Sequence, residues 1–244
     1  MSRQRLDQAI EARGLLPSRS RARDAILRGT VAVNGAVVTK PHAGVSAEDT
    51  ITLNDPAARY VSRAALKLVA GLDAGAVNPK GRICLDLGSS TGGFTEVLLE
   101  RGAVRVYAVD VGHDQLHESL RGNPKVVSLE GVNGRDLTRA LIPEPPSLIV
   151  SDVSFVSLTK VLDAPLALLA PEAEAVLLIK PQFEVGREHI GKGGIVTDLD
   201  AIARAEADIL AFMAERGFTH RVSVPSPIAG GDGNRETVAV FARQ

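Results

Sequence analysis

Residues 83–95 read ICLDLGSSTGGFT, and this stretch decides the fold. Its apolar start predicts a buried parallel strand that ends at Asp86, and FTEVLL at residues 94–99 predicts a helix. The residues between them are glycines, serines and a threonine. A strand, a glycine-rich turn and a helix N-terminus are typical of a nucleotide-type cofactor site, because glycine lets the backbone approach a ligand closely. An aspartate at the strand end can bind the ligand's polar groups.

The same stretch indicates which cofactor is bound. The dinucleotide pattern G-x-G-x-x-G is not met, because its middle glycine is replaced by Ser90. Asp110 ends the next apolar run, VRVYAVD, where a ribose-binding carboxylate belongs. An acid before the glycines and a second acid after the next strand favour S-adenosylmethionine (SAM) over NAD.

Composition and charge limit the class of protein. The chain has 244 residues, 45% of them hydrophobic, which is enough for one large domain or for a small and a medium one. Residues 1–67 carry eleven Arg or Lys against six Asp or Glu, a net +5, and the remainder carries seventeen against twenty-three, a net −6. A basic N-terminal module on an acidic body predicts contact with a polyanion at one end. A solvated charged surface is the alternative.

The N-terminal module has the pattern of a small α+β domain. Residues 5–13 and 19–27 have helical spacing, and TVAVNGAVVTK predicts a hairpin around Asn34-Gly35. Arginines gather on the second helix. We expect this domain to span residues 1–54, with a linker at 55–62 and a larger domain at 63–244. A helix over residues 61–72 should open at Ser62.

From Gly81 onward, strand and helix patterns alternate. The runs ICLDL, VRVYAV, KVVSLEG, LIVSDV and AVLLIK predict strands, and residues 201–216 predict a long helix. The last two runs, FTHRVSVP and ETVAVFA, predict an antiparallel pair that ends the sheet. The pattern predicts an α/β, Rossmann-like doubly wound sheet with helices on both faces, the architecture of SAM-dependent methyltransferases.

Charged side chains follow the predicted strands at their carboxyl ends, where open α/β sheets bind ligands. Asp136 follows the third strand, where adenine is commonly bound in this fold, although a helix N-cap is an equal alternative. Asp152 and Phe155 follow the fourth strand and Lys180 follows the fifth. Phe155 could pack on the cofactor or on the core.

Four charged residues can converge beside this pocket: Lys67, Asp152, Lys180 and Glu236. Two lysines and two carboxylates suit methyl transfer to a ribose 2′-hydroxyl, which is a weak nucleophile. A partly desolvated lysine beside a second cation can take the proton, or its ammonium can stabilise the developing alkoxide. The carboxylates would orient the lysines and compensate their charge.

Two resemblances extend this interpretation. RLD, SRSRARDAI and RGTVAVNGAVVTKP resemble the small RNA-binding domain first seen in ribosomal protein S-four, over about residues 3–53. This resemblance implies an RNA contact through the arginine-bearing helix and the adjoining loops, with Arg5, Arg19 and Lys40 at the family's basic positions.

SRAALKL, DLGSSTGGFT, SDVSF, LIKPQFE and GGDGNRE are similar to ribose 2′-O-methyltransferases of the FtsJ type. With the N-terminal module, residues 3–242 resemble the TlyA family, which is often labelled hemolysin or rRNA methyltransferase. The resemblance implies 2′-O-methylation of cytidine in ribosomal RNA by the four charged residues. It also implies cofactor contacts at Asp86, Gly88, Ser90, Gly92, Gly93, Phe94, Asp110 and Asp136, with Phe155 as a further candidate.

The remaining expectations concern partners and surroundings. Arg187 and Lys192 lie in REHIGKGGIVTD, which we interpret as a glycine-rich substrate loop that touches RNA phosphates. We expect ribosomal RNA or ribosomal subunits as partners, a monomer, no metal and no membrane, in the cytoplasm. A catalytically silent assembly factor that binds SAM and RNA stays an alternative, as does a cytolysin.

Overall fold

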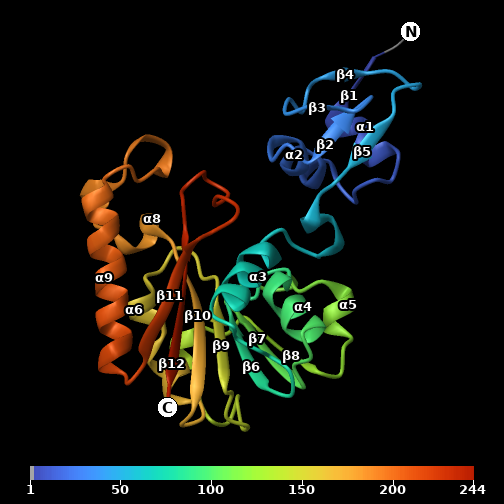
Figure 1. Ribbon diagram of the computed structural model, residues 1–244. Helices are drawn as coiled ribbons and strands as arrows, with labels where there is room; N and C mark the ends of the chain where they lie inside the picture. Colours follow the sequence, from blue (N-terminus) through green and yellow to red (C-terminus); the bar gives the residue numbers. More distant parts are fainter. Residues whose placement is uncertain (1–2) are drawn as a thin grey trace. The chain divides into compact units, whose positions relative to one another are not determined.

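The computed structural model describes residues 3–244, and the chain divides into two compact units on either side of the bond between Arg59 and Tyr60 (Figure 1). The predicted linker, residues 55–62, spans this division and contains the 3-10 helix η1 (Pro56–Arg59). Within the described residues, no helix is both long and apolar enough to cross a membrane.

The small unit packs two helices on short strands, as the sequence predicts. Its elements are β1 (Gln4–Arg5), α1 (Leu6–Ala12), α2 (Arg19–Leu27), β2 (Val31–Val33), β3 (Ala36–Val37), β4 (Gly44–Val45) and β5 (Ile51–Leu53). The β2–β3 hairpin turns at Asn34 and Gly35, which both have positive φ (51° and 83°), as a type I′ turn requires. Aliphatic side chains of both helices, including Leu6, Ile10 and Ile26, form the buried core.

Arg21 of α2 and Arg28, the residue that follows this helix, hold the polypeptide that follows the domain. The Arg21 guanidinium donates to the Ala57 carbonyl at 2.8 Å, and Arg28 pairs with Asp55 at 2.6 Å. The sequence predicts an arginine helix that faces RNA. In the structure, these two side chains contact residues 55–58 within the unit, and their contact with RNA stays a prediction.

The large unit is built on one seven-stranded sheet with the order β11-β12-β10-β9-β6-β7-β8. Neighbouring strands from β10 to β8 run parallel, and β12 is antiparallel to both of its neighbours. The strands are β6 (Ile83–Leu87), β7 (Arg105–Asp110), β8 (Val126–Glu130), β9 (Leu148–Ser151), β10 (Ala173–Ile179), β11 (Thr219–Pro225) and β12 (Thr237–Arg243). The predicted Rossmann-like fold is confirmed.

The two antiparallel strands do not follow one another outward from β10 in chain order. The last strand, β12, lies between β10 and β11, and pairs with both along its length. Burial explains this order. The central residues of β12 are buried on both faces, whereas β11 keeps His220 and Ser223 exposed and carries a register shift between His220 and Val222. The more polar strand therefore takes the edge.

Helices cover both faces of this sheet, and each face has its own core. Leu68, Val97 and Leu98 pack on one face from α3 (Ala65–Ala74) and α4 (Gly93–Glu100). Ile209 and Met213 pack on the other face from α9 (Leu199–Glu215), together with α6 (Leu158–Val161) and α7 (Asp163–Ala167). The shorter helices are α5 (Glu118–Arg121), η2 (Gly134–Asp136), α8 (Pro181–Glu184), η3 (Arg187–His189) and η4 (Lys192–Gly194).

The start of α3 corrects the sequence analysis. The helix begins at Ala65 rather than at residue 61, and no side chain caps it. Ser62 Oγ accepts a hydrogen bond from the Ala64 amide at 3.2 Å, which closes a short turn before the helix. Such local bonding by serine competes with helix formation, so Ser62 lies in a turn that precedes the helix.

The fold brings the carboxyl ends of five parallel strands to one edge. From β6 the strand order proceeds to β7 and β8 on one side and to β9 and β10 on the other. Ligands of open α/β sheets bind outside the carboxyl ends at this change of direction. The loop after β6, which contains Gly88, lies at that point.

Candidate active site

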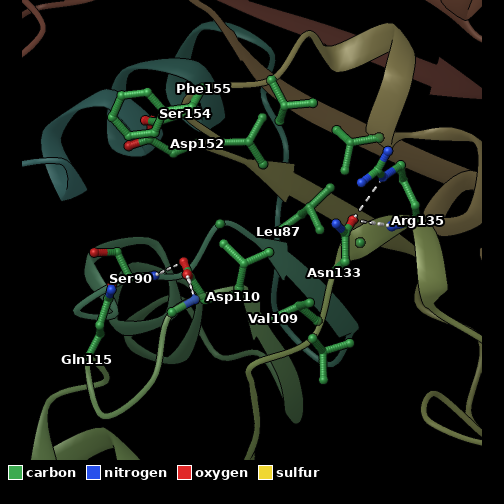
Figure 2. Close-up of a pocket in the computed structure, with 18 residues that line it drawn as sticks. Leu87, Ser90, Val109, Asp110, Gln115, Asn133, Arg135, Asp152, Ser154 and Phe155 are labelled. Carbon is green, nitrogen blue, oxygen red and sulfur yellow. Dashed lines mark hydrogen bonds between the residues drawn. The ribbon is translucent and has the colours of Figure 1, made fainter.

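Two cavities open at the carboxyl edge of the sheet. The larger has a volume of about 590 Å³ and lies over the ends of β6, β7, β8 and β9 (Figure 2). The smaller, of about 160 Å³, lies between the glycine-rich loop, the segment before α3 and Lys180. Gly88, Ser90, Asp152 and Ser154 line both cavities. A ligand in the larger cavity can therefore present a group to the smaller one.

Gly88, Ser90 and Asp110 form one wall of the larger cavity. Gly88 has φ of +84°, and a Cβ there would lie 3.0 Å from the backbone of Asp152, so the position requires glycine. The Ser90 amide donates to Asp110 Oδ2 at 2.8 Å and the Gly112 amide donates to Oδ1 at 2.7 Å. Carboxylate oxygens accept more than one bond each, so Asp110 keeps capacity for ribose hydroxyls.

The second pair of glycines serves packing. A Cβ on Gly92, at φ +97°, would lie 2.3 Å from the Leu120 side chain, and a Cβ on Gly93 would lie 2.8 Å from Ser62. Gly93 and the buried Phe94 still line the smaller cavity, whereas Gly92 lines neither. Close packing around the start of α4 is thus the structural reason for this pair.

Asp86 lies beneath the loop, at the end of β6. It is fully buried, and its Oδ2 accepts a hydrogen bond from the Thr95 hydroxyl at 2.6 Å, while Oδ1 has no partner in the protein. Burial raises the pKa of this carboxyl to about 7, against the opposing effect of the Thr95 hydrogen bond. Asp86 lines neither cavity. A cationic ligand group beside Oδ1 would satisfy both its charge and its unused acceptor.

Figure 2 shows Asp152, Ser154 and Phe155 across the larger cavity from Ser90, Asp110 and Gln115. Phe155 does not join the core: it is 92% exposed, has φ of +66°, and lies against the Phe183 ring at 5.3 Å. Its predicted contact with the cofactor stays a prediction.

Asp136, which the sequence analysis proposes as an adenine contact, does not line either cavity, and its role stays a prediction. It is exposed on η2. Asn133 and Arg135 line the larger cavity at this point, and Asn133 Oδ1 accepts from the Arg135 amide at 3.0 Å (Figure 2). The short 3-10 turn directs these neighbours toward the cavity.

At the smaller cavity, Lys180 links the residues that follow β9 to the end of β10. It follows β10 directly and is 6% exposed. Its Nζ lies 2.7 Å from Asp152 Oδ1 and donates to Ser154 Oγ at 2.8 Å. The cation and the carboxylate that the sequence predicts at the ends of these strands therefore form an ion pair.

Lys67 and Glu236 form a second pair. Lys67 Nζ donates to Glu236 Oε2 at 2.5 Å, and both side chains are buried, so Lys67 does not extend along the surface. Burial raises the pKa of Glu236, while Lys67 and then Lys180 oppose the shift. Ile179 of β10 pairs with Thr237 of β12, so Lys180 and Glu236, which flank these two residues, lie at adjacent strand ends and the two ion pairs are neighbours. The structure thus brings together the four residues that the sequence proposes.

The RNA-binding candidates of the small unit are arranged around Asp7. Arg5 and Arg19 both place a guanidinium nitrogen 3.0 Å from Asp7 Oδ2, and both remain partly exposed. The hydrogen bond from Arg5, with that from Arg19, lowers the pKa of Asp7 to about 2. Lys40 is exposed and precedes Pro41, whose carbonyl accepts from the Asp7 amide at 3.0 Å. One buried carboxylate thus holds two cationic side chains at the surface.

Arg187 and Lys192 are exposed on η3 and η4, in the glycine-rich stretch between α8 and α9. Asn234 anchors this stretch: its Oδ1 accepts from the Val196 amide at 2.9 Å and its Nδ2 donates to the Gly194 carbonyl at 2.8 Å. The two cations therefore lie on a loop that is tied to the segment before Glu236.

Sequence reasoning missed three polar residues of this site. Ser154, Asn133 and Gln115 all line the larger cavity, and each lies within a few residues of the carboxyl end of a strand. That position was the available signal. Uncharged side chains at such ends are common, so only the cavity distinguishes them. Within residues 3–244, no three His, Cys, Asp or Glu side chains are grouped so that they could hold a metal ion.

The class of protein follows from three features: the strand order of the sheet, the glycine-rich loop after β6, and the two lysine–carboxylate pairs. Together they define a Rossmann-like methyltransferase. A model of the FtsJ-like methyltransferase family matches residues 60–243, and a model of the S4 domain matches residues 4–51. The chain belongs to the TlyA family of FtsJ-like methyltransferases that carry an S4 domain.

Similar proteins cover the whole chain. The 16S/23S rRNA (cytidine-2′-O)-methyltransferase TlyA of Mycobacterium tuberculosis is 45% identical over 236 residues, which are 96% of this chain and 88% of that protein. Hemolysin A of Brachyspira hyodysenteriae is 41% identical, over 97% of this chain and 99% of its own length. A solved structure described as a hemolysin, from Streptococcus thermophilus, has a TM-score of 0.77 at 37% identity, and covers 100% of this chain and 90% of that one.

Proposed function

We propose that this chain is a SAM-dependent methyltransferase that transfers a methyl group to the ribose 2′-oxygen of cytidine in ribosomal RNA. The observation that carries the proposal is the Lys180–Asp152 pair at the smaller cavity, with the buried Lys67–Glu236 pair beside it and a larger adjoining cavity suited to a nucleoside. The relative from Mycobacterium tuberculosis, named for this reaction on 16S and 23S rRNA, supports the choice of substrate.

The residues present fit SAM. Asp110 would hold the ribose hydroxyls, and the cavity wall at Asn133 and Arg135 would border the base. The unpartnered Asp86 Oδ1 would face the ammonium group through the glycine loop, since it is buried without a counter-charge. When bound, SAM supplies an electrophilic methyl group on a sulfonium.

The lysines would act on the ribose oxygen. Lys180 lines the smaller cavity, so its Nζ can approach a 2′-hydroxyl there, either as a base or as an ammonium that stabilises negative charge on the oxygen. Asp152 holds Lys180 at 2.7 Å and compensates its charge. Lys67 and Glu236 lie behind this pair and fix its electrostatic surroundings. Alignment of the oxygen with the methyl group would supply a large part of the rate.

The test is transfer of tritiated methyl from SAM to ribosomes, separated subunits and naked rRNA, with modified positions mapped by primer extension at low dNTP. Lys180→Ala should lower transfer at least about 100-fold, because it removes the group that acts on the attacking oxygen. Its affinity for SAM, measured by calorimetry, should stay near that of the wild type. Lys125→Ala, at an exposed lysine before β8, is the matched control and should transfer normally.

Two results would redirect the proposal. Full activity in Lys180→Ala would remove the lysine from the reaction. Binding of SAM and rRNA by the wild type without any methyl transfer would leave an RNA-binding assembly factor. The name of the relative from Brachyspira hyodysenteriae suggests cytolysis, so leakage of dye from liposomes belongs in the same series, and we expect none.

A further inference from the structure

We propose that Ser154 is a positioning residue for methyl transfer, which holds Lys180 Nζ at the mouth of the smaller cavity. The proposal rests on the function proposed above and adds a fifth side chain to the four charged ones. Ser154 Oγ accepts a hydrogen bond from Lys180 Nζ at 2.8 Å. The other hydrogen bond of this ammonium group, to the Asp152 carbonyl, is 3.4 Å long.

Charge attraction by Asp152 does not by itself fix the lysine. Asp152 Oδ1 lies 2.7 Å from Nζ, yet it is a buried oxygen without an aligned hydrogen bond. An ammonium at the end of a four-carbon stem rotates easily about its bonds. Directional bonding to the Ser154 hydroxyl therefore defines where Nζ points.

Ser154 is also placed where the substrate must arrive. It is exposed, and it lines both the larger and the smaller cavity (Figure 2). Its hydroxyl keeps one proton after it has accepted from Lys180, and this proton can be donated to an oxygen in the cavity. A ribose 2′-oxygen that gains negative charge is the acceptor with the right chemistry.

The loop that carries Ser154 is held on three sides. Gly88 packs on the backbone of Asp152, with no room for a Cβ. Phe155 adopts φ of +66°, a strained backbone conformation for such a residue, which persists only where the surroundings enforce it. Glu184 Oε1 accepts from the Leu158 amide at 2.9 Å, which fixes the end of the loop at α6. These contacts restrain the loop on both sides of Ser154.

The first test compares Ser154→Ala with Ser154→Thr in the full-length chain, by single-turnover methyl transfer to rRNA and by calorimetric binding of SAM. Ser154→Ala should lower the transfer rate about tenfold, with the dissociation constant for SAM within twofold of the wild type. Ser154→Thr keeps the hydroxyl and should recover most of the rate. Ser157→Ala, three residues further along and without contact to Lys180, should keep at least half of the rate.

Two outcomes of this test overturn the proposal. An unchanged rate in Ser154→Ala would do so, and so would a loss of SAM affinity as large as the loss of rate, since Ser154 would then be a cofactor contact only.

A second test needs neither RNA nor turnover. In ¹H–¹⁵N correlation spectra of lysine side chains, the Lys180 ammonium, assigned by its loss in Lys180→Arg, should exchange its protons slowly in the wild type. The exchange should become at least tenfold faster in Ser154→Ala. Equal exchange in both proteins, or no slowly exchanging Lys180 signal in the wild type, would overturn the proposal. Absence of methyl transfer by the wild type would instead refute the proposed function.

Discussion

Asp86 and Asp110 end neighbouring strands, and their surroundings give them different properties. Asp110 is partly exposed and accepts amide hydrogen bonds at both oxygens, from Ser90 and Gly112. Asp86 is fully buried and accepts one bond from Thr95. Asp110 keeps acceptor capacity for a ligand beyond these two amides. Asp86 is the acid whose protonation depends on pH near neutrality, because burial raises its pKa to about 7.

The buried acid predicts how stability changes with pH. The folded protein keeps the Asp86 proton from about pH 4 to pH 7, where the unfolded chain releases it, so the free energy of unfolding should fall as pH rises through this range. Asp86→Asn removes this loss, which is on the order of 4 kcal/mol. We expect its urea midpoint to decline less than that of the wild type between pH 5 and pH 8. If the urea midpoints of the two proteins changed equally with pH, the raised pKa of Asp86 would be contradicted.

Variants of the Lys67–Glu236 pair can distinguish an effect on stability from an effect on methyl transfer. Lys67→Ala leaves Glu236 buried without its cation, which should cost about 3–5 kcal/mol in the free energy of unfolding. The double variant Lys67→Met with Glu236→Leu should regain most of this stability, because neither charge remains buried. Neither protein should transfer methyl groups efficiently. Urea unfolding and methyl transfer measured on the same preparations test this, and a double variant that is stable and active would assign the pair a purely structural role.

At the scale of elements, the loop between α8 and α9 depends on a residue from another segment. Asn234 is 2% exposed and bonds both the Gly194 carbonyl and the Val196 amide. Nearby, Gln182 of α8 donates to Asp232 at 2.9 Å. The loop with the RNA-binding candidates Arg187 and Lys192 and the segment before β12 are therefore tied together beside Glu236.

Removal of this tie should loosen the loop. Asn234→Ala leaves the buried Val196 amide unpaired, at a cost of about 1–3 kcal/mol, and also removes the donor to the partly buried Gly194 carbonyl. Hydrogen exchange should show loss of protection at residues 191–196, while protection of β6 and β7 stays unchanged. The methyl transfer rate should fall with SAM affinity retained. Asn78→Ala, at an exposed turn, is the control, and equal protection in both variants would show that the loop does not depend on Asn234.

At the scale of the whole molecule, we expect the small unit to supply affinity for RNA. Arg5 and Arg19 are held at Asp7 with their guanidinium groups partly exposed. Replacement of both by Ala in the full-length chain should weaken rRNA binding about tenfold near 100 mM salt. The magnitude of the slope of log affinity against log salt concentration should fall by about 1.4 to 1.8. Binding then neutralises two fewer phosphates and therefore releases fewer counterions. Binding titrations at several salt concentrations measure this. Arg101→Ala, paired with Asp73 in the large unit, is the control, and an unchanged slope in the double variant would contradict RNA contact at these residues.

The sequence predicts the architecture well, because its patterns are local. Apolar runs and the Asn34-Gly35 turn specify strands, and the charged residues Asp152 and Lys180 at strand ends specify the position of the site. It could not predict features that depend on which surfaces meet. The sequence does not show that the Arg21 guanidinium donates to the Ala57 carbonyl, because this contact depends on where residues 55–58 lie. Ser154 is ordinary until its hydroxyl is seen on Lys180.

The place of β12 in the sheet has a consequence for synthesis. The ribosome makes β10 and β11 before β12, yet β12 lies between them. A nascent chain therefore cannot complete its sheet until residues 237–243 have left the exit tunnel, and β11 must stay undocked or pair temporarily elsewhere until then. Glu236 immediately precedes this strand, so Lys67 acquires its carboxylate partner only after β10 and β11 have been synthesised. A nascent chain arrested before residue 236 should contain the glycine-rich loop after β6 but only three of the four charged residues proposed for catalysis.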